Sequence, residues 1–383
     1  MQEHSVLSHD ELYALVERVF QPTDRDTHLA VITDLPSTPA DDLPAWRQRR
    51  ELAANWAQSL AAMSARTGLT ADFYLYPNVG QNNADLPDMV WPYRQAKLPS
   101  CARDLENETA EPFHALFERT QIVIAPTQYS TTAPLKLAAA KHGFRAATMP
   151  GFSNAMVPAL RLDYVAIDQQ VRRLKDLLDR AEAAYFRFET DAGSAMLELD
   201  LRFRTAHASS GLVTQPGTAG NLPSGEAYIV PYEGERQGTP SRSSGILPVQ
   251  FGEEVVSFRV EGNRAVGVES DGPASRQQAR KLRREPAYGN IAELGLGVLS
   301  GFGIQPIGTI LLDEKLGLHI AFGRSDHFGG QVGARHFSSP DQAVHIDWVY
   351  LSATQPAVQI RSLMLELPGG ETFALMRDQS YAI

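Results

Sequence analysis

The chain has 383 residues, of which 43% are hydrophobic and 21% charged, and a formal net charge of −10. This is the composition of a folded globular protein that is too long for one ordinary domain. The acidic balance argues against a general affinity for nucleic acid, and no apolar run reaches the roughly 18 residues that span a bilayer. The N-terminus lacks a secretory pattern, and one cysteine, Cys101, leaves no internal disulfide. We therefore predict a cytoplasmic protein without a membrane or nucleic-acid partner.

Short β-rich runs alternate with helical patterns through the first half of the chain. This alternation predicts a parallel sheet with helices packed on its faces. A further helix is predicted over 163–183, where apolar residues recur every three or four positions. The expected strands are 28–36, 71–79, 121–126 and 144–150, and the expected helices are 9–20, 41–66, 111–119 and 131–142.

After residue 185 the pattern changes to short strands and turns. The runs on either side of 191–194 alternate apolar and polar side chains, which predicts a hairpin. The basic cluster 276–284 is short, and we expect it to face solvent. The prediction is an α/β N-terminal domain of residues 1–190 and a strand-rich α+β C-terminal domain of residues 191–383. Later strands are expected at 254–260, 264–269, 317–323, 343–350 and 357–366.

The residues best suited to chemistry lie in this second half. The run AVHIDWVY at 343–350 is a strand by composition, and alternation along a strand puts His345 and Asp347 on one face. The run LGLHIAFG puts His319 on a second strand. Imidazole and carboxylate groups that converge from neighbouring strands are typical of a metal site.

Two glutamates extend this candidate site. Glu226 follows the turn Pro-Ser-Gly in NLPSGEAYIVP, and Glu293 is a lone carboxylate in the apolar run GNIAELGLG. A carboxylate is rarely buried unless it is paired or bound to a metal, so either a salt bridge or a metal would explain Glu293. With the three residues above, these glutamates make a charge of −3, which nearly balances two divalent cations. The mixed ligand set suits zinc, cobalt or manganese in a hydrolytic site.

Four motifs in this half resemble the aminopeptidase T and aminopeptidase S family of metallopeptidases. In chain order they are NLPSGEAYIVPYEGERQG, GNIAELGLG, LDEKLGLHIAFG and VHIDWVY. The resemblance implies a homodimeric two-metal exopeptidase in which metal-activated water attacks an amide or peptide bond of a small substrate. It makes Glu226, Glu293, His319, His345 and Asp347 the metal ligands, and it implies that Glu226 or a close neighbour handles the proton of the water.

The chain departs from that family seven residues after His319. The family's peptidases carry a tyrosine there, thought to stabilise the transition state, whereas this chain has Asp326 followed by His327. An ionised carboxylate cannot donate a hydrogen bond to an oxyanion, but an imidazole can. Asp326 and His327 are therefore catalytic candidates together with Glu226. The departure also favours a small amide, lactam or modified amino acid as substrate over a peptide.

Two other functions fit the same residues. His319, His345 and Asp347 alone make the two-histidine, one-carboxylate set of non-haem Fe(II) oxygenases. A ring-cleaving dioxygenase that acts on a dihydroxypyridine is similar to the same aminopeptidase family. The second alternative is a binding protein that keeps the fold without catalysis.

Overall fold

In the computed structural model, which describes residues 6–95, 97–339 and 342–382, the chain divides into two compact units. Unit 1 contains residues 1–168 and 209–224, and unit 2 contains residues 169–208 and 225–383. This division differs from the single boundary predicted near 190. Helix α7 (Tyr164–Arg180) runs from one unit into the other, and the strand that follows it already belongs to unit 2.

Unit 1 is built on a seven-stranded sheet in the order β10-β6-β5-β1-β2-β3-β4. The strands from β10 to β2 are parallel, and β3 and β4 add antiparallel pairs at one edge. The four predicted strands are confirmed within two residues. Their bounds are β1 His28–Leu35, β2 Thr70–Pro77, β3 Met89–Pro92, β4 Glu111–Pro112, β5 Ile122–Ala125, β6 Arg145–Thr148 and β10 Ala219–Asn221.

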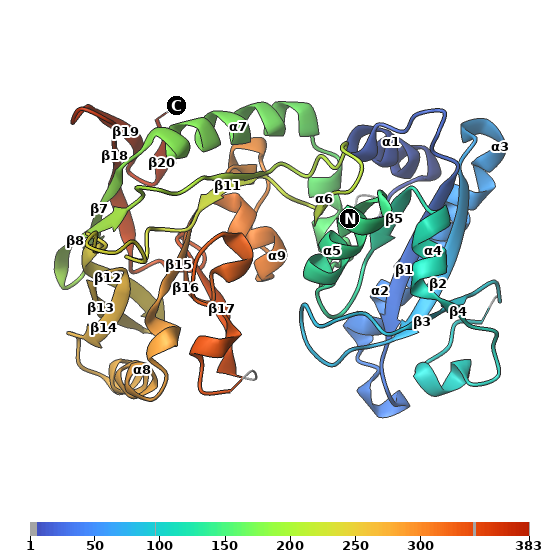
Figure 1. Cartoon of the computed structure of the whole chain (residues 1–383), viewed down its shortest axis with the longest axis horizontal. Coiled ribbons are helices and arrows are strands. Elements are labelled where there is room, and N and C mark those ends of the chain that lie inside the picture. The colour runs from blue at the N-terminus through green and yellow to red at the C-terminus, as the bar shows by residue number, and fades with distance from the viewer. Residues whose placement is uncertain (1–5, 96, 340–341, 383) are drawn as a thin grey trace. The chain divides into compact units, whose positions relative to one another are not determined.

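Helices pack around this sheet, as the alternation predicts (Figure 1). The first helix starts where Ser8 and Glu11 form a capping box, which satisfies two backbone N–H groups at the helix start. The predicted helix 41–66 is two helices, separated at Met63. The helices are α1 His9–Phe20, α2 Pro44–Ala62, α3 Ser64–Thr67, α4 Phe113–Arg119, α5 Thr132–His142 and α6 Val157–Leu160.

Unit 2 contains two largely antiparallel sheets. The larger has the order β14-β13-β12-β8-β7-β18-β19-β20, and its central hairpin β7–β8 is the one predicted around 191–194. Its strands are β7 Ala183–Thr190, β8 Gly193–Asp200, β12 Ser244–Phe251, β13 Glu254–Glu261, β14 Arg264–Val268, β18 Gln359–Glu366, β19 Thr372–Arg377 and β20 Ser380–Tyr381.

The smaller sheet has the order β17-β16-β15-β11-β9. Strands β15 and β16 are buried along their whole length, and the edge strand β17 is partly exposed. Helices α8 (Pro273–Arg284) and α9 (Ile310–Asp313) complete the unit. The strands of this sheet are β9 His207–Ser209, β11 Glu226–Ile229, β15 Ile291–Gly297, β16 Leu318–Gly323 and β17 His345–Val349.

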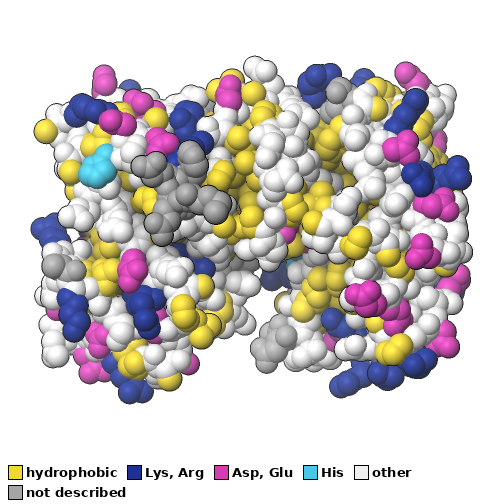
Figure 2. Space-filling model, turned by 180° about the vertical axis from the view of Figure 1, so that it is seen from behind, with side chains coloured by type: hydrophobic (Ala, Val, Ile, Leu, Met, Phe, Trp, Pro, Cys, Tyr) yellow, Lys and Arg dark blue, Asp and Glu magenta, His cyan; other side chains and the backbone are white. Residues whose placement is uncertain are grey.

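The basic cluster 276–284 lies on α8, which packs against β13 and β14. Its arginine side chains face solvent, as predicted. Figure 2 shows dark blue side chains along the edge of the molecule where α8 lies, and elsewhere on that face the two signs of charge are interspersed. None of the helices in the described ranges is long and apolar enough to cross a membrane.

Candidate metal centre

The five predicted ligands lie on four neighbouring strands of the smaller sheet in unit 2. Glu226 begins β11, Glu293 lies in β15, His319 in β16, and His345 and Asp347 in β17. Register explains how they meet, because Ala321 pairs with Asp347 on one side of β16 and with Glu293 on the other. The antiparallel sheet therefore brings together residues that are far apart in the chain.

The ligand atoms form two groups that share Glu293. The inner group is Glu226, Glu293 and His319, and the outer group is Glu293, His345 and Asp347. His319 Nε2 lies 3.3 Å from Glu293 Oε1, and His345 Nε2 lies 3.3 Å from Glu293 Oε2. His345 Nε2 is also 3.3 Å from Asp347 Oδ1, and His319 Nε2 is 3.7 Å from Glu226 Oε2. Each oxygen of Glu293 thus faces a different histidine.

Two local features of β15 make room for this arrangement. The pairing between β15 and β16 shifts register between Ile291 and Glu293, and such a bulge re-aims a side chain. Gly295 pairs with His319, and a Cβ at Gly295 would lie 1.9 Å from His319 Nε2. Only glycine at this position leaves space for the imidazole ring.

Sequence reasoning missed a buried lysine in this site. Lys315 is 2% exposed, and its ammonium donates a hydrogen bond to Glu226 Oε1 and forms an ion pair with Glu314. The signal was present in the LDEKLGLHIAFG motif, since a lysine four residues before His319 follows an acidic pair. Lys315 places one positive charge inside the carboxylate cluster. A buried, ionised carboxylate requires such a compensating charge.

The protonation of the metal-free cluster follows from its burial and its charges. Burial disfavours a charged His319, but its hydrogen bond to Glu293 and the nearby carboxylates raise its pKa to about 9. Asp347 and Glu293 likewise raise the pKa of His345 against the effect of burial. Burial raises the pKa of Glu226 despite the positive charge of Lys315. Protons on the two imidazoles therefore balance carboxylate charge when no metal is bound.

The residues present fit a bound cation. Glu226 Oε2 is buried and has no hydrogen-bond partner among the described residues, although a buried acceptor normally has one. The other oxygen of Glu226 accepts the hydrogen bond from Lys315. A metal ion in the inner group would satisfy the orphaned oxygen, and carboxylate with imidazole is a ligand set that divalent metals accept.

The two catalytic candidates on the loop after β16 have different surroundings. Asp326 accepts a hydrogen bond from Arg324 Nε, and despite its partial burial this partner lowers the pKa of Asp326. The ring of His327 lies 5.4 Å from the ring of His345, between centroids. Burial and the positive charges of His345 and Arg324 lower the pKa of His327 to about 4. Asp326 is therefore ionised at neutral pH, and His327 is neutral with one N–H to donate.

Aromatic rings line the outer group on this side. Phe328 packs edge to face against His345 and against Tyr228 of β11, with centroids 5.4 and 4.9 Å apart. His207 stacks on Tyr228 and bonds through Nε2 to the Phe328 carbonyl at 3.0 Å. A pocket of about 410 Å³ lies beside this loop, lined by Asp326, Gly330, Gln331, Gly333, Ala334 and Arg335.

No family model and no curated protein sequence matches the chain. Two solved structures share its fold over 98% of both chains. One is 2,5-dihydroxypyridine dioxygenase from Pseudomonas putida KT2440, with a TM-score of 0.61 and 15% identity. The other is wild-type AmpT, an aminopeptidase from Thermus thermophilus, with a TM-score of 0.55 and 14% identity. At these identities the likeness concerns the fold, a two-domain mixed α/β architecture that both enzymes use.

Proposed function

We propose that the chain is a metal-dependent hydrolase that cleaves an amide bond of a small substrate with two divalent ions. The observation that carries the proposal is the sharing of Glu293 between two complete three-residue groups. A carboxylate whose two oxygens face two separate histidines suits a bridge between two ions. Zinc, cobalt or manganese fits the carboxylate and imidazole ligands.

Glu226, Glu293 and His319 would hold one ion, and Glu293, His345 and Asp347 the other. The ions would polarise the substrate carbonyl and lower the pKa of the attacking water. Glu226 or a close neighbour would accept the proton of that water, as the family resemblance implies. The raised pKa of Glu226 favours this role, and Lys315 fixes one of its oxygens.

His327 is the residue we assign to the developing oxyanion. The lowered pKa of His327 keeps its imidazole neutral, so that one ring nitrogen carries a hydrogen to donate. The ring lies next to that of His345, which brings this donor near the outer group. Asp326 is held by Arg324 and has no proton to donate. We assign Asp326 to orienting the loop and to binding an amine of the substrate, which an ionised carboxylate attracts.

The substrate class follows from the roles given to His327 and Asp326. A small amide, a lactam, a modified amino acid or a short peptide would offer the carbonyl that the site requires. The family resemblance further suggests a homodimer, and the acidic chain offers no general basis for binding nucleic acid.

A ring-cleaving Fe(II) dioxygenase is the competing function. The rings of His327 and Phe328 beside His345, with Tyr228 packed against Phe328, favour it because they suit a flat aromatic substrate. The grouping of the ligands favours the hydrolase. Among the described residues His319 and His345 fall in different groups, whereas a two-histidine, one-carboxylate iron site needs both on one ion.

Metal analysis of protein purified without chelator, combined with two activity assays, tests the choice. The hydrolase predicts about two non-iron ions per chain and ammonia release from amino-acid amides. About one iron per chain, with oxygen consumption in the presence of 2,5-dihydroxypyridine, would instead establish the dioxygenase.

A further inference from the structure

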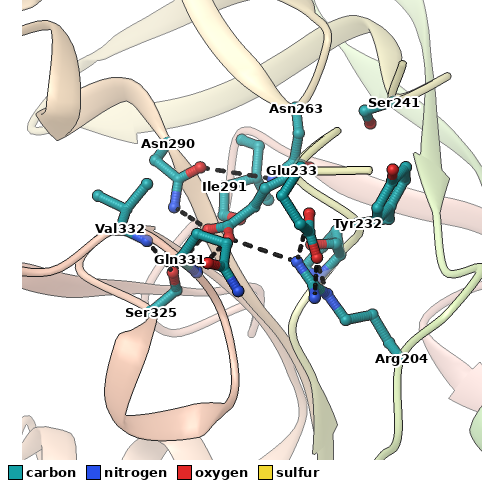
Figure 3. Close-up of polar contacts among 12 residues, drawn as sticks. Arg204, Tyr232, Glu233, Ser241, Asn263, Asn290, Ile291, Ser325, Gln331 and Val332 are labelled. Atoms are coloured by element: carbon teal, nitrogen blue, oxygen red, sulfur yellow. Dashed lines mark hydrogen bonds and ion pairs between the residues drawn. The ribbon is translucent and has the colours of Figure 1, made fainter. Parts of the chain in front are cut away.

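A further carboxylate with a buried side chain, Glu233, belongs to neither ligand group but contacts the loop that follows β16. It follows β11, its side chain is 5% exposed, and it accepts hydrogen bonds from several donors (Figure 3). Asn290 Nδ2 donates to Oε1 at 2.8 Å, and Arg204 Nη2 lies 3.3 Å from Oε2. The guanidinium balances the charge of Glu233, which allows the carboxylate to stay ionised in the interior.

The remaining two donors come from both ends of one loop. Ser325 Oγ donates to Glu233 Oε1 at 2.6 Å, and the backbone N–H of Gln331 donates to Oε2. Ser325 is fully buried, and its Oγ also accepts from Val332 N at 3.3 Å. One carboxylate therefore fixes the start and the end of the segment 325–331, which carries Asp326, His327 and Phe328 between them.

The same loop also orients a predicted metal ligand. The carbonyl of Arg324, next to Ser325, lies 2.8 Å from His345 Nδ1. A carbonyl only accepts, so Nδ1 carries the hydrogen in this bond. His345 Nε2 is then the nitrogen that faces Glu293 and Asp347. A hydrogen bond to the far nitrogen of a ligating histidine sets its tautomer and its ring orientation.

We infer that Glu233 is a positioning residue of the metal centre, which orients His345 and His327 by fixing the loop 324–332. The inference rests on the metal centre of the proposed function. It deepens that function, because a carboxylate outside both ligand groups would then set the metal affinity of the outer group and leave that of the inner group unchanged. Figure 3 shows Glu233 between Arg204 on one side and Asn290, Ser325 and Gln331 on the other.

Three variants separate this role from simple packing. Glu233→Gln removes the charge and replaces one acceptor oxygen by an amide that faces donors. Ser325→Ala removes the Ser325 hydrogen bond to Glu233 and the acceptor of Val332 N, and it keeps the bond from Gln331 N and the Glu233–Arg204 ion pair. Glu235→Gln is the matched control, because Glu235 pairs with the same Arg204 at Nη1, is 27% exposed, and has no bond to the loop among the described residues.

Two measurements apply to each variant. The first is zinc affinity by competition with a chromophoric chelator. We expect Glu233→Gln and Ser325→Ala to raise the dissociation constant of zinc at the outer group about 10- to 100-fold. Glu235→Gln should leave this constant unchanged. The second is the exchange-protected Nδ1 proton of His345 in nuclear magnetic resonance spectra of the metal-free protein. We expect this signal in the wild type and in Glu235→Gln, and its loss in the other two variants.

An unchanged proton signal together with unchanged zinc affinity in Ser325→Ala would overturn the inference. This test holds even if Glu233→Gln does not fold. An equal effect of Glu235→Gln would overturn it too, because the ion pair alone would then explain the result. A wild type that binds no zinc would refute the proposed metal centre. The proton signal would in that case still decide whether Glu233 positions His345.

Discussion

The inner and outer ligand groups share one carboxylate but lie in different surroundings. The inner group is almost completely buried, with Glu226 at 5%, Glu293 at 4% and His319 at 1% exposure, and Lys315 lies against it. In the outer group the side chains of His345 and Asp347 are 20% and 11% exposed.

This difference teaches that two similar ligand sets can serve different purposes. An ion in the inner group would be shielded from exchange and surrounded by fixed charge. An ion in the outer group would face the loop with His327 and Phe328, where a substrate can reach it.

The largest effect is expected where the groups join. Glu293→Gln removes the charge common to both, so we expect loss of both ions and a drop in turnover of roughly 10³-fold or more. Elemental analysis and a hydrolysis assay would measure these effects. Asp200→Asn, which neutralises a fully buried carboxylate paired with Arg202 elsewhere in unit 2, is the control and should keep its metal. Full metal content in Glu293→Gln would exclude Glu293 from the site.

The next test separates the groups. His319→Ala should remove the inner ion and His345→Ala the outer ion, so each variant should hold about one ion per chain instead of two. The ion left in His319→Ala should exchange with free metal faster than the ion left in His345→Ala, because it is the more exposed one. Metal content measured before and after dialysis against a second metal decides this. Two retained ions in both variants would show that the site is misplaced.

A smaller effect is expected beside the outer group. His327→Ala should lower kcat by roughly 10² to 10³, the size of losing one oxyanion donor. KM should change only a few-fold, since that interaction strengthens in the transition state. Asp326→Asn keeps the shape of the side chain and removes the charge that pairs with Arg324, so we expect a smaller fall in kcat than for His327→Ala. Equal losses of kcat in both variants would argue for a structural role of the loop.

The smallest effect concerns pH. His319 is protonated below its pKa of about 9 and must lose this proton to bind metal. The zinc affinity of the inner group should therefore rise about tenfold per pH unit and level off above pH 9. Zinc titrations at several pH values measure this slope, and His345→Ala, which is expected to keep the inner ion, should show it without the outer group. An affinity independent of pH between 7 and 9 would contradict the raised pKa.

Local patterns were enough to predict much of the fold. The helix 9–20 begins and ends as predicted, because Ser8 and Glu11 mark its start and apolar residues recur at helical spacing. The strand with His345 and Asp347 was predicted from its composition, and alternation put both side chains on one face, from which they reach the same cluster. Such features depend on residues close in sequence.

What could not be predicted depends on pairing between distant segments. The register of β15 against β16 decides that Glu293 meets two histidines, and no local signal carries that register. Glu233 is one of two glutamates in YEGER, and only the fold shows that it binds both ends of the later loop. The domain boundary near 190 was predicted from a change of sequence pattern. In the structure the chain passes from unit 1 to unit 2 earlier, after residue 168 within α7.

The strand β10 has a consequence for how the protein forms during synthesis. It completes the sheet of unit 1 beside β6, yet it is made after the first strands of unit 2. Until residues 219–221 leave the ribosome, β6 has an unpaired edge, and such edges promote wrong association. A fragment that stops at residue 190 should therefore aggregate more readily than one that extends through 224, although both contain every helix of unit 1.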